Sequence, residues 1–467
     1  MTIVYHDNPD SSKQTTTAKM SGTPEVPFGA EMRRKHFAFA PRYTPLNHGS
    51  YGTVPKSVRA THVALEAEVD AAPDPFISLD FYGRLAEQRA LAARVLGAAD
   101  PDEVVFVPNA TTGTDTVLKN FEWQDGDTVL VYELVYGAVA HGLSWLEETR
   151  GVHVHVARPQ WPLPDDELVA TMVAAAREVQ TTPGRRLRLA IVDSIISMPG
   201  LRVPYERLVP ALQAEGAMVL VDAAHGIGHI DINLDVLRPD FLVTNLHKWF
   251  FVPRGCAALY IPRRHQPLIR TSLPTSHGFT PRRRLGVIDE DGETFTEMFS
   301  FTGSDDTTAW LCVQAAIDFR TNVCGGEAAI KAYCREVAQR SAAVVADIFG
   351  TEILDCPGSC IRDCFFANVR LPIELGTDDA DSGSGSGKVS PEHAPRVVRW
   401  IKIRGERESG FYFQTWLYRG AWWWRLSGAI YVEVEDFRRG AEVLKALCER
   451  IRNGELARDP ETGPLTA

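Results

Sequence analysis

The chain has 467 residues, 45% of them hydrophobic, which is enough for one large and one smaller domain. A formal net charge of −11, without a basic stripe of interleaved aromatic residues, argues against a nucleic-acid partner. No apolar run is long enough to span a bilayer, and the eight cysteines, which cluster late, do not resemble a secreted disulfide framework. We therefore expect a globular cytoplasmic protein.

The order of strand-like and helical patterns along the chain predicts an α/β fold. Residues 1–26 are rich in Ser and Thr without the apolar core of a signal peptide, so we expect a disordered tail, followed by an N-terminal segment over residues 27–60 that joins a smaller domain. Seven strand-like runs alternate with helical patterns within residues 61–315: Val104–Val107, Thr128–Tyr132, Val152–Val156, Leu187–Asp193, Ala217–Asp222, Phe241–Thr244 and Cys256–Ile261. This alternation predicts a mostly parallel sheet with helices on both faces.

A small turn rich in hydroxyls follows the first strand. In Asn109–Gly113, the hydroxyls of Thr111 and Thr112 and the backbone amides of a helix start would suit a phosphate dianion. The same residues could also form an ordinary helix N-cap. A second turn of this kind, Gly303–Ser304, precedes another helical pattern.

Two neighbouring strands are followed by an acid and an amine. Asp222 ends the run Ala217–Val221, and Lys248 closes the stretch that begins with Asp240–Val243. Ligands of open α/β sheets bind beyond the carboxyl ends of the strands, so both groups should face one crevice. A partly desolvated lysine can condense with an aldehyde such as that of pyridoxal phosphate, and an aspartate can pair with the protonated pyridine nitrogen.

Metal binding is the alternative for these polar residues. His225 can stack on, or hydrogen-bond, the polar edge of a pyridine cofactor, but Asp222, His225 and His229 could instead bind zinc. A zinc site would leave Lys248 without a role. The spaced cysteines of Cys356–Cys364 fit no standard ligand set, so we predict no metal there.

The last third of the chain predicts a smaller α+β domain over residues 316–460. An amphipathic helical stretch over Glu327–Ile348 leads into mixed strands and helices. The run 376–389 contains Ser-Gly-Ser-Gly-Ser-Gly and predicts a flexible insertion.

Several motifs resemble the class V, fold type I pyridoxal-phosphate enzymes, and within them the fungal hercynylcysteine sulfoxide lyases of ergothioneine biosynthesis and the isopenicillin N epimerase-like proteins. The motifs are Leu46–Gly52, Asn109–Gly113, Ser197–Gly200, Asn245–Trp249, Leu273–Phe279 and Arg425–Ser427. The resemblance implies a fold type I transferase fold, pyridoxal 5'-phosphate as cofactor, and a homodimer with active sites at its interface.

The resemblance also assigns the cofactor-binding residues. Lys248 would hold the cofactor covalently, Asp222 would pair with its ring nitrogen, and His225 would lie by its ring hydroxyl. The residues implied to hold the phosphate are Thr111, Thr112, Asn245 and His247, with Gly303 and Ser304 from the other subunit. Relatives usually carry Gly-Thr at this last turn, so Ser304 departs slightly while it keeps a hydroxyl.

The substrate-binding residues implied by the resemblance are Asn47, His48 and Arg425, the last as a bidentate partner of the α-carboxylate. Tyr136 would stack on the cofactor ring and protonate the leaving sulfur group. A plain core tyrosine is the alternative at that position, with Tyr51 and Tyr132 as competitors for the acid role.

The resemblance favours β-elimination at a cysteine sulfoxide, to a thiol or sulfenate product, pyruvate and ammonia. Epimerisation, transamination and other C–S or C–N reactions also begin with loss of the Cα proton, so they remain alternatives. A hercynine substrate carries a permanent trimethylammonium, which aromatic faces would bind. Candidate aromatic residues are Tyr51, Phe81, Tyr82, Phe279 and Trp422–Trp424, although the tryptophans could be core packing.

Overall fold

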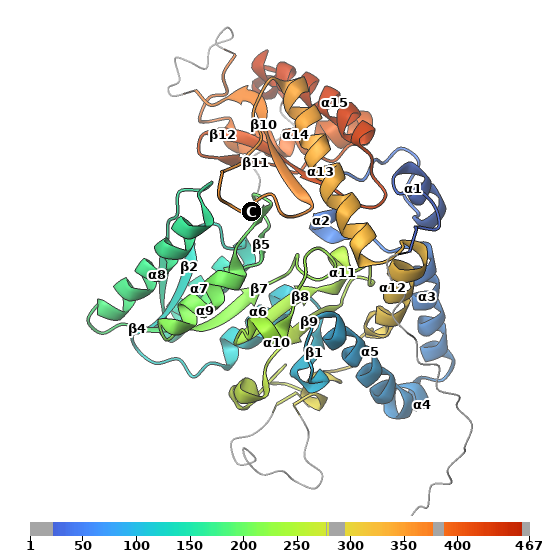
Figure 1. The fold of residues 1–467 in the computed structure, drawn as a ribbon, viewed down its shortest axis with the longest axis vertical. Coiled ribbons are helices and arrows are strands. Elements are labelled where there is room, and N and C mark those ends of the chain that lie inside the picture. Colours follow the sequence, from blue (N-terminus) through green and yellow to red (C-terminus); the bar gives the residue numbers. More distant parts are fainter. Residues whose placement is uncertain (1–21, 277, 280–294, 377–386, 460–467) are drawn as a thin grey trace, which may run out of the picture.

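The computed structural model describes residues 22–276, 278–279, 295–376 and 387–459, and its large domain is built on a seven-stranded sheet (Figure 1). The sheet order is β1-β9-β8-β7-β4-β2-β3. The strands are β1 (Val104–Val107), β2 (Asp127–Tyr132), β3 (His153–Ala157), β4 (Arg186–Asp193), β7 (Met218–Asp222), β8 (Phe241–Asn245) and β9 (Ala257–Tyr260). Only β9 runs antiparallel to its neighbours among the described strands of this sheet. The predicted fold is confirmed, with each strand end within one residue of its expected position.

Helices cover both faces of the sheet because its strands are apolar throughout. Successive side chains point to opposite faces, so Leu130 and Tyr132 enter one core while Val129 and Val131 enter the other. The helices that contribute to the first core are α5 (Phe81–Val95), α8 (Asp165–Thr181) and α9 (Tyr205–Ala214), and those of the second are α6 (Ala110–Asn120) and α7 (Gly137–Arg150).

The smaller domain is a three-stranded antiparallel sheet with long helices packed on it (Figure 1). Its strands, in spatial order, are β10 (Phe366–Glu374), β12 (Ala421–Ser427) and β11 (Thr415–Tyr418), and its helices are α13 (Glu327–Phe349), α14 (Ala394–Ser409), α15 (Val434–Arg452) and α16 (Glu455–Arg458). The insertion predicted at 376–389 lies mostly outside the described residues. At its base, the Val389 amide donates to the Glu374 carbonyl.

Further helices and short strands complete the described fold. They are α1 (Ala30–His36), α2 (His48–Tyr51), α3 (Lys56–Ala71), α4 (Pro73–Pro75), β5 (Ile195–Ile196), β6 (Leu201–Arg202), α10 (Leu234–Leu237), α11 (Leu246–Trp249) and α12 (Val313–Asp318). The N-terminal segment lies against the smaller domain, where Arg33 pairs with Asp436 at 2.7 Å. Residues 22–26 were expected in the disordered tail, but the Glu25 amide donates to the Val323 carbonyl and Val26 is buried. The predicted tail boundary is therefore too late in the chain.

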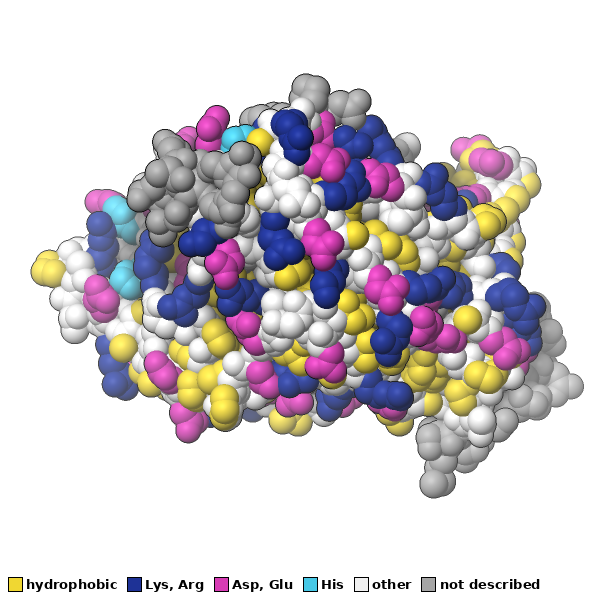
Figure 2. Space-filling view, turned by 90° about the horizontal axis from the view of Figure 1, so that it is seen from above, with side chains coloured by type: hydrophobic (Ala, Val, Ile, Leu, Met, Phe, Trp, Pro, Cys, Tyr) yellow, Lys and Arg dark blue, Asp and Glu magenta, His cyan; other side chains and the backbone are white. Residues whose placement is uncertain are grey.

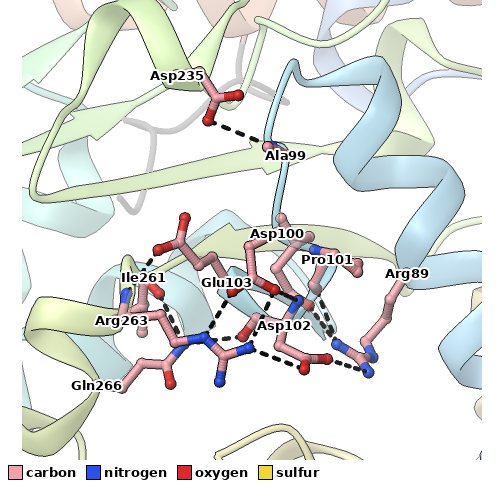
Figure 3. Close-up of polar contacts among 11 residues, drawn as sticks. Arg89, Ala99, Asp100, Pro101, Asp102, Glu103, Asp235, Ile261, Arg263 and Gln266 are labelled. Atoms are coloured by element: carbon pink, nitrogen blue, oxygen red, sulfur yellow. Dashed lines mark hydrogen bonds and ion pairs between the residues drawn. The ribbon is translucent and has the colours of Figure 1, made fainter.

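An ionic network fixes the turn that enters β1 (Figure 3). Arg263 Nε lies 2.7 Å from Asp100 Oδ2, and Arg263 also pairs with Asp102. Arg89 is buried and donates to the carbonyls of Pro101 and Val104. Exposed ion pairs contribute little stability, so the buried Arg89 is the main anchor. It fixes the start of the strand that leads into α6.

The surface carries charges of both signs. Lys and Arg side chains alternate with Asp and Glu on the face shown in Figure 2, without a stripe of one sign. Among the helices that the structure describes, none combines the length and the apolar character needed to cross a bilayer.

Candidate active site

Lys248 lies in the one-turn helix α11 that directly follows β8, and not at the strand end itself. Its protein surroundings lower its pKa to about 8, mainly through burial, with the nearby Asp222 opposing this change. Lys248 Nζ lies 3.3 Å from His225 Nε2. The Trp249 indole donates to His225 Nδ1, so the neutral imidazole carries its proton on Nε2. This proton faces Lys248 Nζ, an arrangement that suits a neutral amine.

Two carboxylates accompany this amine. Asp193 and Asp222 end the neighbouring strands β4 and β7 and pair in register. The Ala224 amide donates to Asp222 Oδ1 at 2.9 Å, and the Tyr132 hydroxyl donates to Asp193 Oδ2 at 2.7 Å. Burial raises the pKa of both acids, and the charge of Asp222 raises the pKa of Asp193 further. Asp222 was predicted from the sequence as a site residue, whereas Asp193 was not.

These groups border a cavity of about 180 Å³ at the carboxyl ends of β4, β7 and β8. The predicted site residues that line it are Thr111, Tyr136, Asp222, His225, Asn245, His247 and Lys248. The other lining residues are Ser50, Tyr51, Asn109, Ala110, Thr114, Val139, Asp193, Ile195, Ser197 and Ala224. The structure therefore gathers most of the predicted cofactor-binding residues at one site.

The start of α6 forms one end of this cavity. Asn109 is the N-cap, and its Oδ1 accepts from both the amide and the hydroxyl of Thr112, at 2.9 and 3.1 Å. Asn245 Oδ1 accepts from the Ala110 amide at 2.9 Å, which ties the end of β8 to this helix. Thr112 thus serves the cap and does not line the cavity of the described chain, so its predicted contact with the phosphate stays a prediction.

Thr114 contributes a hydroxyl to the site that was not predicted from the sequence. It lines the cavity one helical turn after Thr111, and its buried Oγ1 has no hydrogen-bond partner in the described chain. A buried hydroxyl without a partner is costly, so a ligand oxygen here would relieve that cost. The spacing of Thr111 and Thr114 on one helix face was the available signal.

His247 is fixed by the backbone on one side of its ring. Its Nδ1 donates to the Cys256 carbonyl at 2.9 Å, and burial lowers its pKa to about 4. The neutral ring therefore presents an acceptor at Nε2. If His247 holds a phosphate through Nε2, the ring must take up a proton on binding.

Arg425 in β12 is a buried cation surrounded by neutral groups. It donates to the Ser197 carbonyl, to Asn47 Oδ1 at 2.8 Å and to Ser50 Oγ at 3.1 Å, and it stacks over Phe366 at 4.5 Å. Burial lowers its pKa to about 10, and within the described residues it forms no ion pair. Asn47, predicted to bind substrate, contacts Arg425 instead and does not line the cavity.

His48 was also predicted to bind substrate, but it lies buried behind the lysine. Its Nε2 is 2.8 Å from the Lys248 carbonyl oxygen and its Nδ1 is 2.5 Å from the Tyr431 hydroxyl. Burial lowers its pKa to about 4, so the ring is neutral at physiological pH. It does not line the cavity of the described chain, and its predicted contact with substrate stays a prediction.

The structure also shows the positions of His229, from the alternative zinc site, and of Tyr132, an alternative acid. His229 Nε2 accepts from the Phe365 amide at 2.6 Å, and the His229 ring stacks on that side chain, which leaves it poorly placed for the zinc site with Asp222 and His225. Tyr132 is buried against Asp193 and does not line the cavity. The position of His229 therefore does not support the zinc site, and the position of Tyr132 does not support it as the acid.

Only some aromatic candidates for the distal end of the substrate meet the cavity. Tyr51 is the candidate that lines it, and this residue is 69% exposed; Tyr136, which was predicted to stack on the cofactor, lines it as well and is 47% exposed. Trp422 and Trp424 are fully buried, and Trp424 packs on core phenylalanines, so these two rings belong to the core. Phe81 is likewise buried in the core.

Gly303 and Ser304 are exposed and do not line the cavity of their own chain. Their predicted contact with the phosphate requires a second subunit, and it stays a prediction.

The residues present fit pyridoxal phosphate. Lys248 supplies a partly desolvated amine for its aldehyde, and Asp222 supplies a carboxylate at the neighbouring strand end for its ring nitrogen. The start of α6, with the unsatisfied hydroxyl of Thr114, supplies donors for its phosphate.

Comparisons with known proteins agree with this geometry. Residues 77–369 match the family Aminotransferase class-V. The chain is 36% identical over 453 residues to an L-cysteine desulfhydrase-like protein, lolT1, of Epichloe uncinata, covering 92% of this chain and 98% of the relative. It is 29% identical over 421 residues to the hercynylcysteine sulfoxide lyase of Schizosaccharomyces pombe, covering 90% and 98% of the two chains.

The fold also matches a solved structure of the cystine C–S lyase C-DES with its product cysteine persulfide. The TM-score is 0.67 at 17% sequence identity, covering 87% of this chain and 97% of the other. This protein therefore belongs to the aminotransferase class V family of pyridoxal-phosphate enzymes, in the group that contains carbon–sulfur lyases and cysteine desulfhydrases.

Proposed function

We propose that this enzyme cleaves the Cβ–S bond of a cysteine sulfoxide conjugate, hercynylcysteine sulfoxide, by β-elimination. The observation that carries the proposal is the buried Arg425, whose partners among the described residues are all neutral and which reaches the cavity wall through Ser50 and Ser197. An α-carboxylate is the anion that an amino-acid substrate would offer it. Its binding there would bring Cα into the cavity that also holds the Lys248 amine.

Different residues around the cavity can carry out different proton transfers of the reaction. When bound, pyridoxal phosphate draws electrons from Cα and makes the Cα proton acidic. Lys248 Nζ accepts this proton, since its lowered pKa favours a neutral amine. The Cβ–S bond then breaks, and the sulfur leaves with the bonding electron pair as a sulfenate. Tyr136, at the cavity mouth, donates its phenolic proton to that group.

The products follow from the atoms that remain. The three-carbon enamine left after departure of the sulfenate takes up water and yields pyruvate and ammonia. Tyr51 supports the choice of a hercynine conjugate, because an exposed ring at the cavity can meet a trimethylammonium by a cation–π contact.

Assays on the purified holoenzyme separate the candidate reactions. With hercynylcysteine sulfoxide, we expect pyruvate and ammonia in equal amounts. Transfer of the amine to an added keto acid without pyruvate would indicate an aminotransferase, and inversion at Cα without pyruvate would indicate an epimerase. The same conjugate without its N-methyl groups is the control for the distal end, and an unchanged kcat/KM would reject cation recognition.

We also propose a homodimer in which the Gly303–Ser304 turn completes the cofactor site of the other subunit. Its exposure in the single chain supports this proposal. Lys248→Ala and a Gly303→Trp variant, each inactive alone, should regain activity when they are unfolded together and refolded, because one site per mixed dimer carries neither change. Absence of any recovery, with mixed dimers verified by mass, would contradict the shared site.

A further inference from the structure

The short helix α2 lies directly against the backbone of the lysine helix α11. A Cβ atom on Gly52 would lie 1.9 Å from the His247 carbonyl oxygen and 2.9 Å from Lys248 Cα, and Gly52 has a positive φ of +63°. A Cβ on Gly49 would lie 2.4 Å from Phe366 Cζ and 3.1 Å from the Trp249 ring. Only glycine permits this approach, so the N-terminal segment and the catalytic lysine meet backbone to backbone.

His48 forms the polar connection within this contact. The Lys248 carbonyl can only accept, so His48 Nε2 must donate to it over 2.8 Å. In the neutral ring Nδ1 is then an acceptor, and the Tyr431 hydroxyl donates to it over 2.5 Å. One tautomer satisfies both bonds, and the Tyr431 hydroxyl selects it.

The other end of α11 is also held by a buried side chain. Arg320 donates to the Trp249 carbonyl at 2.7 Å and to the Gly228 carbonyl at 3.1 Å, and it pairs with Glu327. The carbonyl groups of Lys248 and Trp249 thus both accept hydrogen bonds from side chains outside the large sheet. Of these, only His48 acts on the residue that carries the amine.

We infer that His48 is a positioning residue for Lys248, and that Tyr431 fixes the tautomer in which His48 does this, so that the smaller domain sets the orientation of the catalytic amine. The bond to the Lys248 carbonyl fixes the peptide plane from which the side chain departs, and the peptide plane limits the rotamers that reach the cavity. The inference rests on the role of Lys248 with the cofactor and not on the proposed substrate.

Two amide substitutions separate the two bonds of His48. In His48→Gln, the side-chain amide can replace Nε2 and still donate to the Lys248 carbonyl. In His48→Asn, the shorter side chain can replace Nδ1 and accept from Tyr431, but it cannot reach Lys248. Both variants are polar and similar in size, so they are matched controls for packing.

The measurements use apoenzyme and need no substrate. The rate at which each protein captures pyridoxal phosphate is followed by absorbance, and the pH dependence of Lys248 acylation is followed by peptide mass spectrometry. We expect His48→Gln to capture the cofactor within about threefold of wild type and His48→Asn to be slower by tenfold or more, as expected for loss of a buried hydrogen bond. Tyr431→Phe should fall between the two.

A structural role would give a different pattern. If His48→Asn and His48→Gln lose capture rate equally, in step with a fall in melting temperature, His48 only stabilises the fold and the inference is wrong. Capture at the wild-type rate by His48→Asn would also overturn it. If His48→Asn does not fold, Tyr431→Phe decides, because a slowed capture at an unchanged melting temperature supports positioning, whereas wild-type capture by this variant contradicts it.

Discussion

The large-domain side and the small-domain side of the cavity are assembled in different ways. On the large-domain side, Asp193 and Asp222 end two neighbouring strands of one sheet, and Lys248 lies just beyond the end of the next strand. On the small-domain side, Arg425 comes from β12 and is held by Asn47 from the N-terminal segment. The large-domain residues lie together at the carboxyl ends of adjacent strands in one sheet. The small-domain residues come together only after segments distant in the sequence have packed.

The two sides also differ in charge. The large-domain side has its amine beside two acids, so its charges can be balanced within the protein. The small-domain side has a single buried guanidinium with neutral partners, and burial lowers its pKa to about 10. The large-domain side is thus equipped to hold the cofactor and move a proton, while the small-domain side awaits an anion from the substrate.

Removing the amine should give the largest effect. Lys248→Ala should lose activity by roughly 10⁴-fold or more, because one group supplies both the covalent link and the base. Borohydride should no longer fix the cofactor to the protein, which mass spectrometry of the reduced protein measures. Lys331→Ala, which removes an amine paired with Asp231 outside the cavity, is the control and should behave as wild type. Borohydride fixation that persists in Lys248→Ala would mean that another amine holds the cofactor.

Removing the cation on the small-domain side should give the next largest effect. Arg425→Gln should lower kcat/KM by on the order of 10²-fold, because the substrate carboxylate loses a charge-assisted pair. Cofactor affinity should change little, since the guanidinium contacts no cofactor-binding residue of the cavity in the described chain. Asn47→Ala should cost less than Arg425→Gln, because it only loosens the arginine. An Asn47→Ala effect as large as that of Arg425→Gln would place Asn47 in direct contact with substrate.

The large-domain side could be predicted from the sequence, and the small-domain side only in part. Strand ends supplied Asp222 and Lys248, and the same rule would have supplied Asp193, since it ends the predicted strand Leu187–Asp193. Helix periodicity would have preferred Thr114 to Thr112 beside Thr111. His48 has no local signal, because its partners Lys248 and Tyr431 lie 200 and 383 residues away. Tertiary packing alone defines its role.

The amine should show its lowered pKa when the apoenzyme captures cofactor. Only the neutral amine has a lone pair for the aldehyde, so the capture rate should rise with pH and level off above about 8. Below that value the rate should fall about tenfold per pH unit. Stopped-flow absorbance between pH 7 and 10 measures this profile. A rate that still rises above pH 10 would show an ordinary solvated lysine.

Asp222 provides a check on that profile. Its negative charge raises the pKa of Lys248 against the effect of burial, so Asp222→Asn should shift the capture profile to lower pH. An unchanged midpoint would mean that the two groups do not interact across the cavity.

The smallest expected effect concerns the start of α6. Thr114→Val keeps the shape of the side chain and removes the unsatisfied hydroxyl that borders the cavity. We expect the Kd of pyridoxal phosphate to rise about fivefold, because one hydrogen bond contributes on the order of 1 kcal/mol.

Thr112→Val is the matched control, since its hydroxyl donates to Asn109 and not into the cavity. It should lower the melting temperature through the weakened cap and leave the Kd nearly unchanged. If Thr112→Val weakened the cofactor as much as Thr114→Val, the predicted pair Thr111 and Thr112 would be right, and the cavity face of α6 would be set by the cap instead of the helix period.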